Sequence, residues 1–407
     1  MNFRADCESE RLRRRQRAPT AGLIQKPQTQ VLSNHYNAIF MAPASHNDFV
    51  NLSLPAAAAR IRDAMGTKSA HIDRILRLAN VTAVGIGFRN RDRQGLKELC
   101  LVCSVDRKKP LSELGDRDRV PGFLGDFRVD VVASGRFRAL AGNQAGQQVE
   151  RMRPVRPGLS IGNVDITAGT FGCVVERNGE RLMLSNNHVL ANGNKARLGS
   201  PILQPGKYDG GDPRKDAIAR LVEFVPIVYD GERDTPPPID KPQPPANPAR
   251  PNSPAEPGGC GRGLSMFSGK ARTAEPFNRV GRNRVDCALA KPDGAMSTDI
   301  LGIGQPRGVG MGALGMAVRK SGRTTGLTQG QIEQIDVTSR IEYDNRSATF
   351  TGQIMAGALS AGGDSGSAVL DMAGNVIGLL FAGSTTSTLI NPIQDVLDAL
   401  NVELVLA

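Results

Sequence analysis

The chain lacks tryptophan altogether and has only four tyrosines and four histidines among its 407 residues. Aromatic residues make up 4% of the chain, whereas hydrophobic residues of all kinds make up 40%. This hydrophobic share suffices for a full-sized core and excludes a wholly disordered chain. Glycine (46) and proline (26) are abundant, which favours short strands and turns over long helices.

The sequence has no apolar run long enough to span a membrane, and residues 1–8 are polar, unlike the start of a secretory signal. We therefore expect a cytoplasmic protein that does not bind a membrane. Six cysteines are scattered along the chain. Cys100 and Cys103 have a metal-like spacing, but no second pair and no nearby histidine completes a site. We expect buried thiols, no metal and no other cofactor.

Positive charge is confined to the N-terminal part. Residues 1–157 hold 27 Lys and Arg against 15 Asp and Glu, whereas residues 158–407 hold 24 against 25. Such a segment could contact an acidic partner or nucleic acid, although no nucleic-acid-binding motif accompanies it. A solvated arginine-rich surface is the simpler interpretation. The sequence leaves the oligomeric state open, a homo-oligomer included.

The pattern divides the chain into three parts. Residues 1–52 are basic, and we expect them to be disordered. Residues 53–150 combine a helical period over 53–78 with strand-like runs at 81–88, 98–105 and 127–133, which predicts a small α+β module. Residues 151–407 consist of short apolar strands between glycine and asparagine turns, which is typical of a β-barrel or sandwich.

Two further features belong to this last part. Ten prolines fall between Thr235 and Gly259, so the stretch 234–259 is predicted to be an exposed insertion without helix or central strand. The chain is expected to end in a helix with Asn391 as its N-cap and Pro392 in the first helical position.

The strongest chemical signal is Gly-Gly-Asp-Ser-Gly-Ser at 362–367. A nucleophilic serine must be presented from a tight turn, and the flanking glycines allow the backbone angles that such a turn needs. In this geometry the N–H groups of Gly363 and Ser365 would form an oxyanion hole. The motif therefore makes Ser365 a candidate nucleophile.

A nucleophilic serine needs a base and a carboxylate. His188 is the only histidine after residue 151, and it follows a short apolar strand. Two aspartates precede alternating apolar residues, Asp286 and Asp216. We favour Asp286, because Asp216 follows His188 by only 28 residues and leaves little room for intervening strands. The order His, Asp, Ser is that of chymotrypsin-like proteases and differs from that of α/β-hydrolases and subtilisins. It predicts two six-stranded barrels with the triad between them.

Several segments resemble a group of bacterial trypsin-like peptidases. They are Thr-Ala-Gly-Thr-Phe-Gly-Cys at 167–173, Leu-Ser-Asn-Asn-His-Val-Leu-Ala-Asn at 184–192, Ile-Leu-Gln-Pro-Gly at 202–206, Lys-Ser-Gly-Arg-Thr-Thr-Gly-Leu-Thr at 320–328 and Gly-Asp-Ser-Gly-Ser at 363–367. The plant Narrow Leaf proteins are more distantly similar. The resemblance covers about residues 80–407, and it implies that the run Val-Asp-Cys-Ala-Leu-Ala at 285–290 carries the triad aspartate, Asp286.

The pocket for the substrate residue before the cut is expected about six positions before the serine, at Leu359. Residues 355–363 contain no acid, so cleavage after Lys or Arg is not expected. Phe381, Ala382 and Gly383 would form the pocket wall and the edge that pairs with substrate. We expect a preference for small or apolar residues.

These observations predict an intracellular serine endopeptidase acting on protein or peptide substrates. The alternative is a protease-fold scaffold that is latent or weakly active and serves as a regulatory or binding protein. A third hypothesis is that the basic N-terminal part binds nucleic acid and localises the protease.

Overall fold

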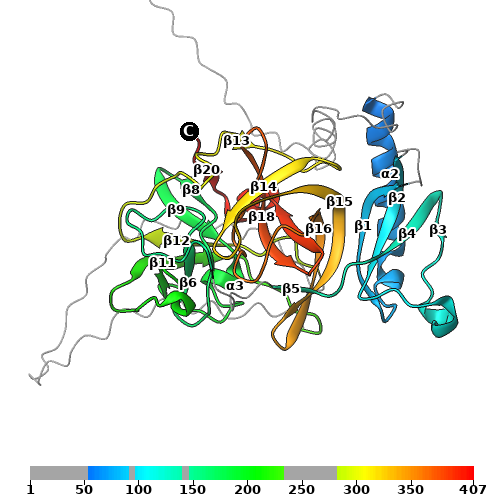
Figure 1. Ribbon diagram of the computed structural model, residues 1–407, viewed down its shortest axis with the longest axis horizontal. Coiled ribbons are helices and arrows are strands. Elements are labelled where there is room, and N and C mark those ends of the chain that lie inside the picture. The colour runs from blue at the N-terminus through cyan, green and yellow to red at the C-terminus, as the bar shows by residue number, and fades with distance from the viewer. Residues whose placement is uncertain (1–53, 91–96, 140–145, 233–281) are drawn as a thin grey trace, which may run out of the picture.

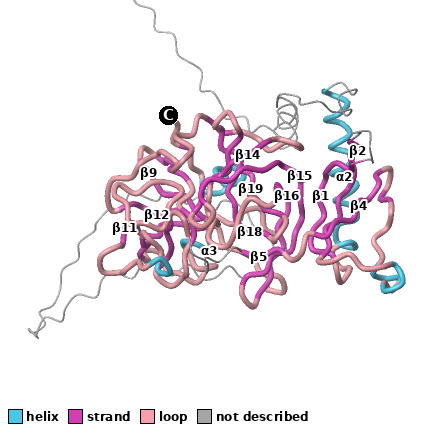
Figure 2. The backbone as a smooth tube through the Cα atoms, viewed as in Figure 1, coloured by secondary structure: helices cyan, strands magenta, loops and turns pink. Residues whose placement is uncertain are grey.

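The computed structural model describes residues 54–90, 97–139, 146–232 and 282–407. The expected basic segment 1–52 and the proline-rich insertion at 234–259 lie outside these residues, as do Ser53, Cys7 and Cys260. Figures 1 and 2 show that the described chain is mainly strand with few helices, in two sheets and one flanking helical layer. The predicted mainly β fold is confirmed; where two six-stranded barrels were predicted, the structure has one closed six-stranded ring and one eight-stranded sheet.

The first sheet has eight strands in the order β20-β8-β9-β12-β11-β10-β6-β7. Most of it comes from the first half of the predicted protease part, and the last strand returns from the C-terminus. Its elements are β6 (Ser160–Asn163), β7 (Gly169–Thr170), β8 (Cys173–Arg177), β9 (Glu180–Ser185), α3 (Asn187–Leu190), β10 (Pro201–Leu203), the 3-10 turn η4 (Lys207–Asp209), β11 (Ala217–Phe224), β12 (Ala288–Pro292) and β20 (Glu403–Leu404).

The second half of the predicted protease part builds a closed six-stranded barrel. Its strands run β14-β17-β18-β19-β16-β15, and β14 also pairs with β15, which closes the ring. The elements are β13 (Gly308–Val309), β14 (Ala317–Gly322), β15 (Gly326–Tyr343), β16 (Arg346–Gly357), β17 (Ala368–Asp371), β18 (Asn375–Gly383) and β19 (Ser387–Pro392). Closure leaves the barrel interior to aliphatic side chains such as Val369, Ile377 and Ile390, all buried.

The N-terminal elements extend this barrel's sheet. They are α2 (Leu54–Ile75), β1 (Val81–Asn90), β2 (Lys97–Val105), the 3-10 turns η2 (Leu111–Glu113) and η3 (Asp116–Asp118), β3 (Phe123–Leu124), β4 (Phe127–Ala133) and β5 (Phe137–Ala139). β1 pairs antiparallel with β15, so the sheet continues from the barrel into β1, β2, β4 and β3 (Figure 1).

The helix and the barrel share one hydrophobic cluster. Ile61 and Ile72 of α2 pack with Val84 and Leu101 of the sheet, and the same cluster includes the barrel residue Ile332. A buried ion pair adds to this contact, with Nζ of Lys68 2.8 Å from Oδ2 of Asp336 on β15. The residues predicted as a separate module are thus joined to the barrel through both sheet and core.

The C-terminal helix α4 (Ile393–Leu400) begins one residue later than predicted, with Pro392 and not Asn391 as the N-cap. The reason lies in the side chain of Asn391, which is fully buried and used elsewhere. Its Oδ1 accepts a hydrogen bond from the backbone N–H of Asp286 (3.0 Å), and its Nδ2 donates to Gln353 (2.6 Å). Asn391 therefore fixes a loop of the first sheet instead of capping the helix.

Candidate active site

His188 lies in the single helical turn α3 that directly follows β9. Its Nδ1 is 2.6 Å from Oδ2 of Asp286, and its backbone N–H donates to Oδ1 of the same carboxylate (3.2 Å). Asn186, just before the helical turn, donates to the backbone carbonyl of Asp286 (2.7 Å). The contact is set by the sheet, because β12 pairs with β9 and brings Ala288 opposite Ser185.

Asp286 is completely buried, and its carboxylate has another hydrogen-bond donor besides His188. Tyr343, at the end of β15, donates its hydroxyl to Oδ2 of Asp286 (2.8 Å). A buried carboxylate needs such partners, because an unpaired charge away from water is costly. Burial, and next the charge of Asp286, raises the pKa of Tyr343 well above its ordinary value, so the hydroxyl keeps its proton and stays a donor.

The alternative aspartate lies elsewhere. Oδ1 of Asp216 is 2.6 Å from Nε of Arg151, and its Oδ2 accepts the backbone N–H of Asp212 (3.0 Å). The backbone hydrogen bond from Asp212 is the largest influence and lowers the pKa of Asp216. Burial raises the pKa and Arg151 lowers it, and the net result is a lowered pKa. Of the two candidates, the structure brings Asp286 to His188 and uses Asp216 to hold a surface turn.

Ser365 lies in the turn between β16 and β17, flanked by two glycines with positive φ. Gly363 has φ +99° and Gly366 φ +93°, a backbone region that other residues adopt only with strain. A Cβ on Gly366 would also lie 2.2 Å from Oγ of Ser185 and 2.3 Å from the carbonyl of Thr170. Both the turn and its close approach to the first sheet therefore require glycine.

The polar groups of the turn are only partly engaged. Oγ of Ser365 donates to the carbonyl of Phe381 (3.1 Å), and the residue is fully buried. Within the described part of the chain, no acceptor meets the N–H groups of Gly363 and Ser365, the predicted oxyanion hole. Nε2 of His188 is likewise buried without a hydrogen-bond partner among the described residues.

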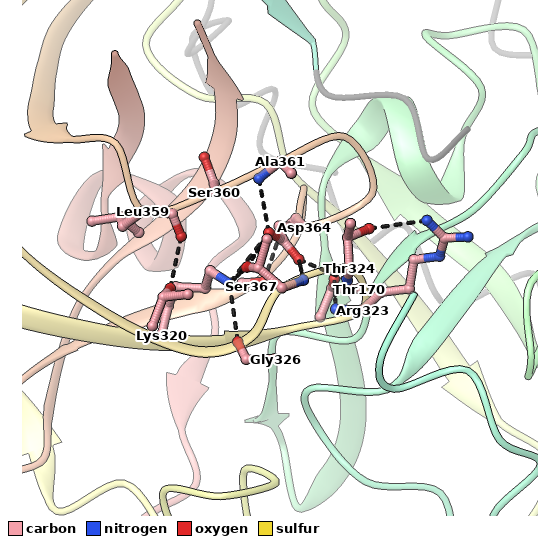
Figure 3. A network of polar contacts seen from close by, with 12 residues as sticks. Thr170, Lys320, Arg323, Thr324, Gly326, Leu359, Ser360, Ala361, Asp364 and Ser367 are labelled. Carbon is pink, nitrogen blue, oxygen red and sulfur yellow. Dashed lines mark hydrogen bonds and ion pairs between the residues drawn. The ribbon is translucent and has the colours of Figure 1, made fainter. Parts of the chain in front are cut away.

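Asp364, the residue before the serine, holds the turn through a dense set of contacts (Figure 3). Nζ of Lys320 is 3.2 Å from its Oδ2, and both side chains are fully buried. Its carboxylate also accepts from the backbone N–H groups of Thr324 (2.8 Å), Thr325 (3.1 Å) and Ala361 (2.9 Å) and from Oγ1 of Thr325 (2.6 Å). Burial, opposed by the charge of Asp364, lowers the pKa of Lys320.

A second buried cation joins the two sheets at the same turn. The guanidinium of Arg323 binds Asp209 of η4 through both of its oxygens, at 2.5 and 2.9 Å. The backbone N–H of Arg323 donates to Oγ1 of Thr170 (3.0 Å), and that hydroxyl donates to the carbonyl of Gly363 (2.9 Å). Forked arginine–carboxylate pairs fix orientation as well as distance, so these contacts hold the turn that carries Ser365 against the first sheet.

A cavity opens beside His188, lined among others by Ala139, Thr167, Tyr343 and Arg346. None of the predicted pocket residues lines it. Leu359 is buried in the hydrophobic cluster of the barrel, and Phe381 packs against Phe350 with ring centroids 4.8 Å apart. Ala382 and Gly383 lie on β18, where they pair with β19 on one side and β5 on the other.

Among the described residues, no cluster of three His, Cys, Asp or Glu side chains could hold a metal ion. Cys100, Cys103, Cys173 and Cys287 are buried free thiols, and burial raises the pKa of Cys103 to about 12. No helix of the described chain is long and apolar enough to cross a membrane.

Sequence reasoning missed two side chains that touch the site, Lys320 and Tyr343. In the sequence, Lys320 stands out only as part of a segment that resembles the peptidase group. A signal for its role is Asp364, because a carboxylate buried next to the nucleophile needs a buried cation as a partner. Tyr343 follows Asp286 by 57 residues at the end of a long hairpin. The register of that hairpin decides where its hydroxyl lies, and no local pattern reveals it.

Comparison with known proteins finds similar solved structures among bacterial serine proteases. The chain is 16% identical to Thermobifida fusca Protease A, over 62% of this chain and 99% of that one, with a TM-score of 0.37. It is 16% identical to Cellulomonas bogoriensis chymotrypsin, over 62% and 99%, with a TM-score of 0.35. No protein-family model and no curated protein matches. The similarity to plant Narrow Leaf proteins stays a prediction.

Proposed function

We propose that the protein is a serine endopeptidase with His188, Asp286 and Ser365 as its catalytic triad. The observation that carries this proposal is the 2.6 Å contact between His188 and a fully buried Asp286, beside a glycine turn that presents Ser365. The contact leaves Nε2 of His188 as the nitrogen available to a substrate or nucleophile. A neutral imidazole held in that tautomer is the form a general base needs.

In the proposed reaction, Oγ of Ser365 attacks the peptide carbonyl while Nε2 of His188 takes its proton. The negative charge that develops on the carbonyl oxygen is stabilised by the N–H groups of Gly363 and Ser365. His188 then returns the proton to the leaving amine, and an acyl-enzyme remains on Ser365. Water, deprotonated by His188, hydrolyses the acyl-enzyme and restores the hydroxyl. Asp286 stays ionised throughout and stabilises the imidazolium.

The described geometry requires one adjustment before this attack. Oγ of Ser365 donates to the carbonyl of Phe381 in the structure. Rotation about χ1 must move the hydroxyl to Nε2 of His188, and such rotamer changes are local and inexpensive. The same observation favours the second candidate function, a protease-fold scaffold in which Ser365 stays engaged and does not react.

We also propose an intracellular setting and a protein or peptide substrate. The four described cysteines are free and buried, which fits a reducing compartment better than a disulfide-dependent fold. An acidic partner for the basic N-terminal part and a homo-oligomer remain hypotheses of the same kind.

The test is labelling with a fluorophosphonate, which reacts with a serine only when a base and an oxyanion hole activate it. The native chain is compared with Ser365→Ala, His188→Ala and, as a matched control, Ser347→Ala, a serine of β16 that bonds Asp230 on the surface. Labelling of the native chain and the Ser347 variant, with loss in the other two, supports the peptidase. A folded native chain that is not labelled supports the scaffold, and labelling that survives Ser365→Ala refutes the assignment.

A further inference from the structure

A strand of the chain itself lies along β18 beside the candidate triad. β5 (Phe137–Ala139) pairs antiparallel with β18, with Ala139 opposite Ala382 and Arg138 opposite Gly383. On its other side β5 runs parallel to β15, with Phe137 opposite Ile341. In Figure 1 the chain leaves β4 and passes through β5 toward α3. Three residues therefore bridge β18 and β15, two strands of the barrel that do not pair with each other.

The register between β5 and β18 would direct an extended peptide toward Ser365. A peptide aligned like β5 would place its next residue opposite Phe381, the residue before Ala382 on β18. The carbonyl of Phe381 accepts the hydrogen bond from Oγ of Ser365. Ala139 and His188 also line the same cavity. β5 thus pairs with the strand whose Phe381 carbonyl contacts the candidate nucleophile, and its Ala139 lines the same cavity as His188.

Side chains anchor β5 in this position. The ring of Phe137 is completely buried in an aromatic cluster that contains Tyr343, Phe350 and Phe381. Nε of Arg138 is 3.0 Å from Oε2 of Glu342 on β15. A buried aromatic ring and a surface ion pair therefore hold β5 against β15 and β18.

The chain is held again where the described residues resume. The backbone N–H groups of Gln147 and Gln148 both donate to the carbonyl of Arg323, at 2.9 and 3.0 Å. Arg323 is the residue whose own N–H reaches Thr170 and, through it, the carbonyl of Gly363. The chain therefore contacts β18 before residue 140 and, after residue 145, contacts Arg323, which is linked through Thr170 to the carbonyl of Gly363.

We propose that β5 is a built-in occupant of the substrate-strand position, which keeps the proposed peptidase blocked until a peptide displaces it. The inference rests on the proposed function of Ser365 and adds a substrate class to it. Peptides that compete must be extended and carry the features that anchor β5, a large aromatic residue followed by a basic one. Tethering gives β5 an effective concentration on the order of millimolar, so a free peptide without these features competes poorly.

The experiment uses the full chain and three serine-directed probes. The first is a small fluorophosphonate, which needs the triad but no paired strand. The second is acetyl-Phe-Arg-Ala-Val diphenyl phosphonate, which matches β5, and the third replaces its phenylalanine by alanine. Each probe is applied to the native chain, to Phe137→Ala and to Arg138→Glu, and the rates of labelling are measured by intact-mass spectrometry.

Two matched controls change the same residue types in the same part of the chain. Phe123→Ala removes a ring that is 55% exposed on β3, and Arg119→Glu reverses a charge in a surface ion pair with Asp116. Neither residue contacts β5 or the site. Arg138→Glu keeps the experiment decisive if Phe137→Ala fails to fold, because the side chain of Arg138 is 69% exposed and its replacement leaves the core intact.

We expect the phenylalanine probe to label Phe137→Ala about tenfold faster than the native chain, since an aromatic anchor of this kind carries much of a peptide's binding energy. Arg138→Glu should also react faster than native, whereas both controls should react like native. All folded variants should prefer the phenylalanine probe to the alanine probe.

Equal rates of the phenylalanine probe with native, Phe137→Ala and Arg138→Glu, while the fluorophosphonate still labels Ser365, would overturn the blocked-strand inference and leave the peptidase proposal standing. Absence of fluorophosphonate labelling in every folded form would instead remove the peptidase proposal, and the inference with it.

Discussion

Replacing Lys320 by methionine would remove the cation that faces Asp364 while keeping an unbranched side chain in a fully buried place. Breaking one partner of a buried ion pair costs about 3–5 kcal/mol, because the other charge stays buried without its partner. Asp364 keeps four further donors from Thr324, Thr325 and Ala361, so the cost should fall at the lower end, about 3 kcal/mol.

This cost falls on the turn that positions Ser365. If most of this free energy lowers the population of the correctly formed turn, the rate of fluorophosphonate labelling falls about one hundredfold, since each 1.36 kcal/mol is about a factor of ten. Lys291→Met is the matched control, because Lys291 pairs with Glu180 on an exposed edge where ion pairs contribute little. Labelling of a folded Lys320→Met variant at the native rate would refute the view that this ion pair holds the turn.

The same residue predicts a pH dependence. Burial sets the pKa of Lys320 in the folded protein below its ordinary value of about 10.4. As pH rises through this lowered pKa, Lys320 loses its proton in the folded state first, and labelling should decline because the ion pair is lost. The effect on stability has the opposite sign. Because the pKa of Lys320 is lower in the folded protein than in the unfolded one, the free energy of unfolding increases as pH rises and the buried lysine loses its charge. In Lys320→Arg the alkaline decline should disappear, since a guanidinium stays protonated.

The remaining predictions concern the carboxylates and the joint with α2. Asp286→Asn should lower kcat for peptide hydrolysis about 10⁴-fold because the imidazole loses its tautomer, whereas Asp216→Asn should leave kcat unchanged. Tyr343→Phe removes a hydrogen bond to a charged group, so kcat should fall about tenfold with little change in KM, as steady-state kinetics would show. Lys68→Met should lower the free energy of unfolding by about 2 kcal/mol in urea titration, because Asp336 then lacks its buried partner. A native-like value for Asp286→Asn, Tyr343→Phe or Lys68→Met would contradict the corresponding contact, and so would a lowered kcat for Asp216→Asn.

The elements that the sequence predicts well are those set by local pattern. The helical period predicted over 53–78 appears as α2 (Leu54–Ile75), and the run at 127–133 appears as β4 with the same bounds. The turn around Ser365 requires positive φ at two positions, and glycine adopts such angles without strain. The glycines of the motif therefore indicate the turn from the sequence alone. The position of His188 after an apolar strand is of the same kind.

The contacts that the sequence leaves open are those set by register and by competition for a side chain. Asn391 has the composition of an N-cap, but a buried backbone N–H of Asp286 takes its oxygen first. Leu359 lies six positions before the serine, but its side chain enters the barrel's hydrophobic cluster. The pairing of β5 with β18 joins residues more than 200 positions apart, and strand registers at such a distance leave no periodic signal.

The unequal attachment of the N-terminal residues gives the blocked strand a physical basis. β1 continues the sheet of β15, the helix α2 shares the barrel's cluster, and the buried Lys68 pairs with the partly exposed Asp336. β5 is only three residues long, and its ion pair with Glu342 is largely exposed, so its hold comes from one buried ring and from short backbone pairings with β15 and β18. Local opening is easiest where few apolar contacts must break. β5 can therefore leave the site while α2 and β1 to β4 stay in place, so that a peptide can bind without detachment of the N-terminal elements.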